Sequence, residues 1–188
     1  MKIEEGKGEM KNTPWGPSQG QNKIGEGVTS YYTAGHGGIE LSPERWAELR
    51  AEIPTFQSWA GEYWLEEDCD WAAAAVLWPE LFSALSVYNA VRTCQGRSGK
   101  DIPDSFWQGR GKKAAEIAYK YEQSLTGKWE CGASGSPPAG SPQGSTWCFL
   151  RRGDETKSVV FAPGYPAAQF YTDEEIQKWE VSTRKATA

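Results

Sequence analysis

The chain has 188 residues, with 25 Asp and Glu against 20 Lys and Arg, and a formal net charge of −5 at pH 7. This length is enough for one domain with a real hydrophobic core, and the acidic balance disfavours binding to a long nucleic acid. No run of about 18 apolar residues is present, so the sequence predicts no membrane span. Residues 1–12 lack the apolar segment of a secretory signal, and we expect a disordered leader on a cytoplasmic protein.

The first predicted strand covers residues 28–33, where β-branched and aromatic side chains favour extended backbone. The preceding residues, 16–27, are polar and rich in Gly, and we expect them to form a loop. The strand ends in A-G-H-G-G at 34–38, which predicts a tight turn around His36. Ser42 followed by Pro predicts the start of a helix over 43–51.

The sequence E-E-D-C-D-W-A-A-A-A-V-L-W at 66–78 places carboxylates before an alanine-rich apolar body. Because acidic residues favour helix N-termini, this pattern predicts the central, most buried helix. Pro79 interrupts it, and a second helix follows over about 81–91. A third helix is expected from about Asp104 to Leu125, weakened at its start by two glycines.

Alternating polar and apolar residues after Gly127 predict three strands, around 128–131, 147–150 and 158–161, in an antiparallel meander. Residues 132–145, rich in Gly, Ser and Pro, are expected to form a mobile hairpin loop. Residues 172–175 predict a capping-box start for a terminal helix. The expected fold is therefore a single α+β domain over 13–188. Its antiparallel sheet, the C-terminal meander plus an N-terminal strand, packs against the central alanine-rich helix and further helices.

Four cysteines, Cys69, Cys94, Cys131 and Cys148, form no C-x-x-C pair, so the sequence shows no zinc knuckle. Cys69 and the only histidine, His36, could form a thiolate–imidazole nucleophile. However, the four acids around Cys69 raise the pKa of its thiol, which favours a buried structural cysteine. Whether Cys131 and Cys148 face each other across the hairpin stays open.

The acids themselves are a second candidate site. Glu66, Glu67, Asp68 and Asp70 could bind a divalent cation with His36 or perform acid–base chemistry, or they could only complement the helix dipole. One histidine builds no two-histidine site, and no phosphate-binding glycine loop is present, so we predict neither metal nor cofactor. The aromatic residues between 59 and 78 could form a stacking platform, but core filling is favoured.

Two segments, TPWGPSQGQNKIGEGVTSYYTAGHGGIELSPERW and EYWLEEDCDWAAAAVLWPELF, resemble an uncharacterised family of proteins from bacteriophages and proteobacterial mobile elements. The shared pattern is P-W-G, then G-H-G-G followed by Leu-Ser, then an aromatic-E-E-D-x-x-W-A helix start. The resemblance covers about residues 13–90 and implies an accessory protein that acts inside an infected bacterium. It marks eight residues as folding or binding positions: Trp15, His36, Gly37, Gly38, Glu66, Glu67, Asp68 and Trp71.

Two hypotheses of function follow. The favoured one is non-enzymatic binding and inhibition of a host protein, such as a defence protein, in the host cytoplasm, with the G-H-G-G turn packed near the acidic segment. The alternative is a hydrolase or transferase that uses His36 with Cys69, or with the carboxylates of Glu66, Glu67 and Asp68.

Overall fold

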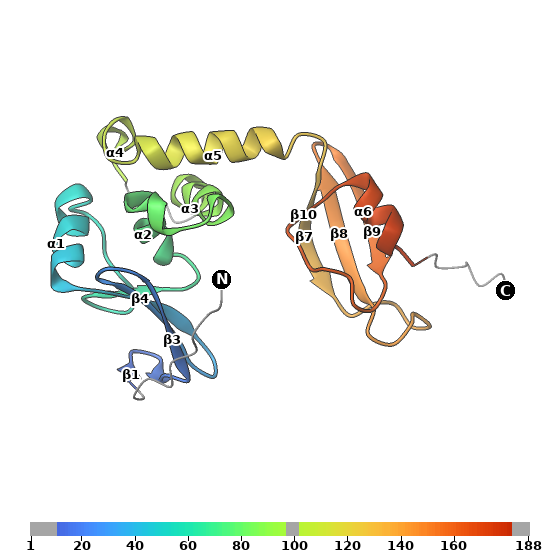
Figure 1. Ribbon diagram of the computed structural model, residues 1–188, viewed down its shortest axis with the longest axis horizontal. Coiled ribbons are helices and arrows are strands. Elements are labelled where there is room, and N and C mark those ends of the chain that lie inside the picture. The colour runs from blue at the N-terminus through green and yellow to red at the C-terminus, as the bar shows by residue number, and fades with distance from the viewer. Residues whose placement is uncertain (1–10, 97–101, 182–188) are drawn as a thin grey trace. The chain divides into compact units, whose positions relative to one another are not determined.

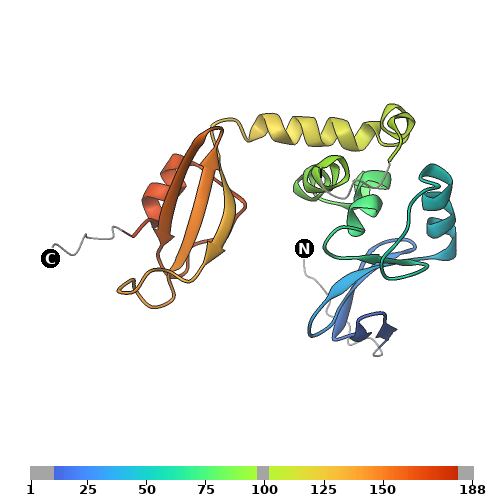
Figure 2. The same ribbon diagram turned by 180° about the vertical axis from the view of Figure 1, so that it is seen from behind.

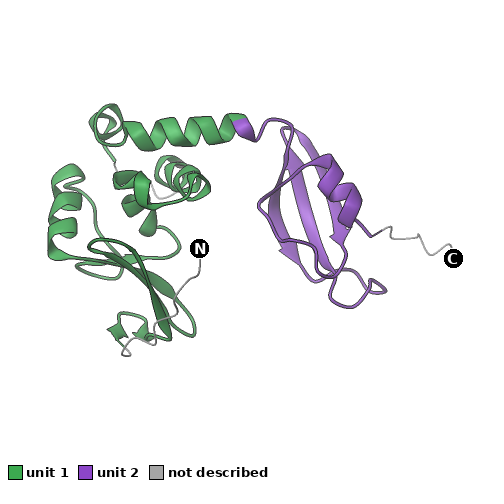
Figure 3. Ribbon diagram, in the orientation of Figure 1, with its two compact units in different colours: residues 1–123 green, residues 124–188 purple. Residues whose placement is uncertain are grey.

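The computed structural model describes residues 11–96 and 102–181, and its contacts divide the chain into two compact units, Met1–Gln123 and Ser124–Ala188 (Figure 3). Both units combine helices with antiparallel strand pairs, so the α+β prediction is confirmed. Whether both units unfold together, as a single domain over 13–188 would, stays a prediction.

The elements of unit 1 appear in Figure 1. They are β1 (Asn12–Thr13), β2 (Gly16–Pro17), β3 (Gly20–Gly25), β4 (Val28–Tyr32), β5 (Gly37–Leu41), α1 (Pro43–Glu52), β6 (Trp64–Glu66), α2 (Trp71–Leu77), the 3-10 turn η1 (Pro79–Leu81), α3 (Ala84–Gly96), α4 (Asp104–Gln108) and α5 (Lys112–Ser124), whose last residue opens unit 2. None of the helices in the described part of the chain has the length and apolar character that a bilayer crossing requires.

The sheet of unit 1 has the strand order β3-β4-β5-β6. The prediction of a loop over residues 16–27 was wrong, because this stretch contains β2 and β3. Pairing with β4, from Gly20 opposite Tyr32 to Lys23 opposite Thr29, overrides the weak strand propensity of these polar residues. Likewise the turn around His36 is shorter than expected, since Gly37 already begins β5.

The start of the predicted leader lies outside the described residues. Its last two residues are part of the fold: Lys11 forms an ion pair with Glu40, and Asn12 begins β1. The helix predicted at 43–51 is confirmed as α1, with the Ser42 hydroxyl accepting a hydrogen bond from the Arg45 N–H.

Helix α2 is the buried centre of unit 1, as predicted: Ala74, Ala75 and Val76 have no exposed surface. The expectation that carboxylates occupy its first turn was wrong. Leu65 is fully buried and pairs with Ile39 of β5, so Glu66 is still a strand residue and the following acids form a turn before the helix begins. The single helix predicted from Asp104 to Leu125 is interrupted. It breaks into α4 and α5 at Gly109 and Gly111, because glycine is a poor helix former.

Unit 2 contains β7 (Trp129–Gly135), β8 (Thr146–Arg152), β9 (Glu155–Phe161), β10 (Phe170–Tyr171) and α6 (Asp173–Trp179), in the sheet order β10-β7-β8-β9. The meander and the capping-box helix are confirmed. The N-terminal strands form their own sheet and do not join it. The hairpin loop is shorter than the predicted 132–145, because Gly135 still pairs with Trp147. Helix α6 covers one face of the sheet and buries Ile176 there (Figures 1 and 2).

The Asp173 carboxylate gives unit 2 a pH-dependent contribution to stability. It accepts hydrogen bonds from the Trp129 indole at 2.8 Å and from Arg152 at 2.7 Å, and these bonds lower the pKa of Asp173. Because the pKa of Asp173 is lower in the folded state, its stabilising effect is present above the unfolded-state pKa of about 3.9. The effect is lost as the pH falls through the folded-state pKa.

We expect Asp173→Asn to be less stable than wild type at pH 7, with the difference in unfolding free energy shrinking toward about pH 2. Urea unfolding at both pH values tests this, and a pH-independent difference would contradict it.

Candidate functional site

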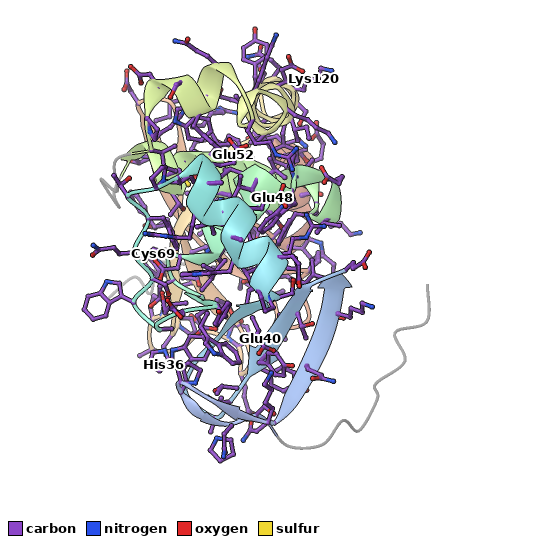
Figure 4. All side chains as sticks on the ribbon, turned by 90° about the vertical axis from the view of Figure 1, so that its left-hand side faces the viewer. His36, Glu40, Glu48, Glu52, Cys69 and Lys120 are labelled. Atoms are coloured by element: carbon purple, nitrogen blue, oxygen red, sulfur yellow. The ribbon has the colours of Figure 1, made fainter. Side chains whose placement is uncertain are left out.

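Pairing of β5 with β6 brings the G-H-G-G segment against the acidic segment, as predicted. Gly38 lies opposite Glu66 in the ladder. His36, in the turn that precedes β5, places its Nδ1 3.7 Å from Oε1 of Glu67 (Figure 4). Both side chains are accessible, with 60% of the His36 and 48% of the Glu67 side-chain surface exposed. At 3.7 Å this contact is too long for a hydrogen bond.

The two glycines after His36 are required by packing. A Cβ on Gly38 would lie under 3.0 Å from both the Trp15 indole and the Leu65 carbonyl oxygen. A Cβ on Gly37 would lie 2.7 Å from the Glu67 carboxylate and 2.9 Å from the Tyr31 carbonyl oxygen. Because these glycines have no side chain, there is room for Trp15 beside Gly38 and for Glu67 beside Gly37. This explains why glycine occurs at both positions.

Trp15 holds the β1–β2 hairpin against the sheet of unit 1. Its ring packs edge-on against Trp64 at a centroid distance of 5.7 Å, and Trp64 contacts Tyr31 at 5.5 Å. The Lys11 ammonium lies over the Tyr31 and Trp64 rings, 5.4 and 5.5 Å from their centroids. Trp15 therefore has a clear structural role, while a binding role for it stays a prediction.

Glu66 organises the acidic turn. One of its carboxylate oxygens accepts hydrogen bonds from the backbone N–H groups of Asp68, at 2.9 Å, and Cys69, at 3.2 Å. The Cys69 sulfur lies 3.8 Å from the same oxygen and 3.7 Å from the Asp70 carboxylate. Cys69 is half-buried and not buried as predicted. Two carboxylates around the sulfur disfavour a thiolate, which supports a structural role of Cys69 over a nucleophilic one. A catalytic pairing of Cys69 with His36 stays a prediction.

Asp70 connects the acidic turn to the loop that carries Trp59. Asp70 is only 2% exposed, and its carboxylate accepts a hydrogen bond from the Trp59 backbone N–H at 2.8 Å. In the same loop the Ser58 hydroxyl donates a hydrogen bond to the Trp64 carbonyl oxygen and accepts one from the Ala60 N–H. These bonds fix the loop backbone on both sides of Trp59.

Trp59 is the residue that sequence reasoning misplaced. Core filling holds for Trp78, which has no exposed surface, but Trp59 is 83% exposed. Tyr63 in the same loop is 36% exposed and has a positive φ of 69°, a strained conformation for a residue with a side chain. The polar and glycine neighbours of Trp59, in S-W-A-G-E, are the sequence signal for its exposure. Trp71, by contrast, is half-buried as the first residue of α2.

Beside His36, a cavity of about 540 Å³ is lined by residues that include Trp15, Pro17, Thr33 and Gly35. Its volume is in the range of ligand pockets, and no charged side chain lines it. Within residues 11–96 and 102–181, no three His, Cys, Asp or Glu side chains are grouped as metal ligands.

A family model described as "Domain of unknown function (DUF7007)" matches residues 8–126. The matched region contains Trp15, the G-H-G-G segment, the acidic turn and the Trp59 loop. No curated protein matches the chain, and no solved structure does.

Proposed function

The chain belongs to the DUF7007 family, and we propose that unit 1 is a protein-binding module whose contact surface is the Trp59 face. We define the Trp59 face as the loop 58–63, the acidic turn 66–70 and His36 beside Glu67. In the setting of a bacteriophage or mobile element, which the sequence resemblance implies, the partner is a host protein in the bacterial cytoplasm. Binding inhibits that protein.

The exposure of Trp59 on a fixed loop carries this proposal. Leaving an indole 83% exposed forgoes much of the burial energy that an aromatic side chain can supply. The buried Asp70 carboxylate and the Ser58 hydroxyl hold the loop backbone in place, so little conformational entropy is lost when a partner covers the ring. Exposed, pre-ordered tryptophans are typical centres of protein interfaces.

The charge around Trp59 favours a basic contact surface on the partner. Between Arg50 and Arg92 the chain contains no Lys or Arg. The Trp59 face itself contains five acids and no Lys or Arg: Glu62, Glu66, Glu67, Asp68 and Asp70. Carboxylates next to an aromatic ring attract Lys and Arg side chains by charge, and the ring binds them by cation–π contact.

Photo-crosslinking tests the Trp59 face directly. Benzoylphenylalanine at position 59 is expected to give a discrete adduct with one protein of a bacterial lysate. The same probe at position 119 is the matched control, because Tyr119 is also an exposed aromatic (63%) but lies on α5. Since Debye screening weakens exposed charges, the adduct yield is expected to fall as the salt rises from about 0.05 to 0.5 M.

A competition experiment measures how much Trp59 contributes to the affinity for the partner. Unlabelled Trp59→Ala is expected to compete for the adduct at least about tenfold more weakly than unlabelled Tyr119→Ala, the usual loss at an interface centre. Equal competition by the two variants, or the same adducts from both probe positions, would exclude the Trp59 face as the contact surface.

A further inference from the structure

The strand register of unit 2 places Cys131 and Cys148 on the same face of the sheet. Cys131 lies opposite Leu150 in the β7–β8 ladder, and Cys148 lies two residues from Leu150 along β8. Alternate residues of a strand point to the same side, so the two thiols are diagonal neighbours. Cys148 is 1% exposed within the core of unit 2, and Cys131 packs against that core.

Each of the two sulfurs also has a polar contact of its own. The Cys148 sulfur lies 3.8 Å from the Tyr165 hydroxyl, and the Cys131 sulfur lies 3.4 Å from the Ala133 carbonyl oxygen. Burial and then the adjoining Cys148 thiol raise the pKa of Cys131 to about 11. The Cys131 thiol is therefore neutral at pH 7.

We propose that Cys131 and Cys148 are a dithiol–disulfide pair, and that its oxidation by a low-molecular-weight disulfide links β7 to β8 within unit 2. The Cys131 thiolate, the more accessible of the two, attacks one sulfur of oxidised glutathione. This step forms a mixed disulfide and releases one glutathione thiolate. The Cys148 thiolate then attacks the Cys131 sulfur and releases the second glutathione. Two protein thiols lose two protons and two electrons, and one reagent disulfide becomes two thiols.

The β-bulge beside Cys131 gives the strand the freedom that this bond requires. Diagonal residues across a strand pair are about 7–8 Å apart at Cα, slightly more than most disulfides span. The ladder is irregular between Cys131 and Ala133, and even a Cβ on Gly132 would have its nearest neighbour, Phe149, at 3.8 Å. Because regular pairing is interrupted at the bulge, the backbone next to Cys131 can adjust there when the bond forms.

Protonation sets the rate of closure. Besides Cys148, the titratable groups that act on the Cys131 thiol are Glu130, its neighbour along β7, and Tyr171, and Tyr165 contacts Cys148. Below a pKa of about 11 the thiolate fraction of Cys131 rises about tenfold per pH unit, so closure is expected to be roughly 100-fold faster at pH 9 than at pH 7.

The test treats the full chain with oxidised glutathione at pH 9, blocks remaining thiols with iodoacetamide, and maps peptides by mass. The expected product is a Cys131–Cys148 linked peptide, accompanied by a higher urea midpoint for unit 2. In Cys131→Ser the linked peptide and the higher midpoint are both lost, whereas Cys94→Ser, which removes a thiol of unit 1, keeps both. Three outcomes overturn the proposal: an unresolved glutathione adduct on Cys131, disulfides joined at random to Cys69 or Cys94, or no oxidation at Cys131.

Discussion

Gly38→Ala is expected to lower the free energy of unfolding of unit 1 by about 2–3 kcal/mol, as overpacking in a filled site does. The added Cβ would collide with the Trp15 indole on one side and the Leu65 carbonyl oxygen on the other. The backbone cannot yield easily, because Gly38 is paired with both Tyr31 and Glu66 in the middle of the sheet. This strain outweighs the gain of about 0.5–1 kcal/mol that Ala has over Gly in extended backbone. Urea unfolding followed by circular dichroism gives the measurement.

Gly35→Ala is the matched control, since a Cβ on Gly35 has no neighbour within 4 Å. We expect it to change stability by less than about 0.5 kcal/mol, as surface substitutions generally do. A double-mutant cycle with Trp15→Ala separates the two collisions: if the indole is responsible for part of the cost, the effects of Gly38→Ala and Trp15→Ala are less than additive. Equal stability of Gly38→Ala and Gly35→Ala would contradict the packing role of Gly38.

Asp70→Ala is expected to destabilise unit 1 by about 2–3 kcal/mol, the cost of losing a hydrogen bond to a charged acceptor and leaving its donor unpaired. The donor is the Trp59 backbone N–H, so the loss falls on the loop that carries the Trp59 face. Hydrogen exchange at the Trp59 amide is the specific readout, and its protection is expected to disappear in the variant. The freed loop must then be ordered on binding, which is expected to weaken adduct formation at position 59.

Asp68→Ala is the control for stability, because Asp68 is an exposed acid in the same turn. Its hydrogen bond to Glu66 comes from the backbone N–H, which alanine retains. We expect a change within about 0.5 kcal/mol and unchanged amide exchange at Trp59. Full protection of the Trp59 amide in Asp70→Ala would show that the carboxylate does not hold the loop.

The positions of the candidate site residues were only partly predictable. The G-H-G-G turn was predicted to pack near the acids, and β5–β6 pairing confirms that they are adjacent. The exposure of Trp59 was not predicted, because the sequence favoured a core position for all aromatic residues between 59 and 78. The polar and glycine neighbours of Trp59 indicate a loop, but the conformation of that loop depends on a contact with Asp70, eleven residues away.

The amino-acid sequence by itself determined the local elements: the Ser42 and Thr172 helix starts, the buried alanine-rich α2, the C-terminal meander and hence the α+β class. These signals are readable because capping, apolar periodicity and alternation act over a few residues. Only the tertiary structure decided that the polar residues 20–25 form a strand and that Glu66 is the last residue of another strand. Strand pairing joins one segment to another, across a hairpin for β3 and across α1 for β6, so its free energy is absent from any single segment.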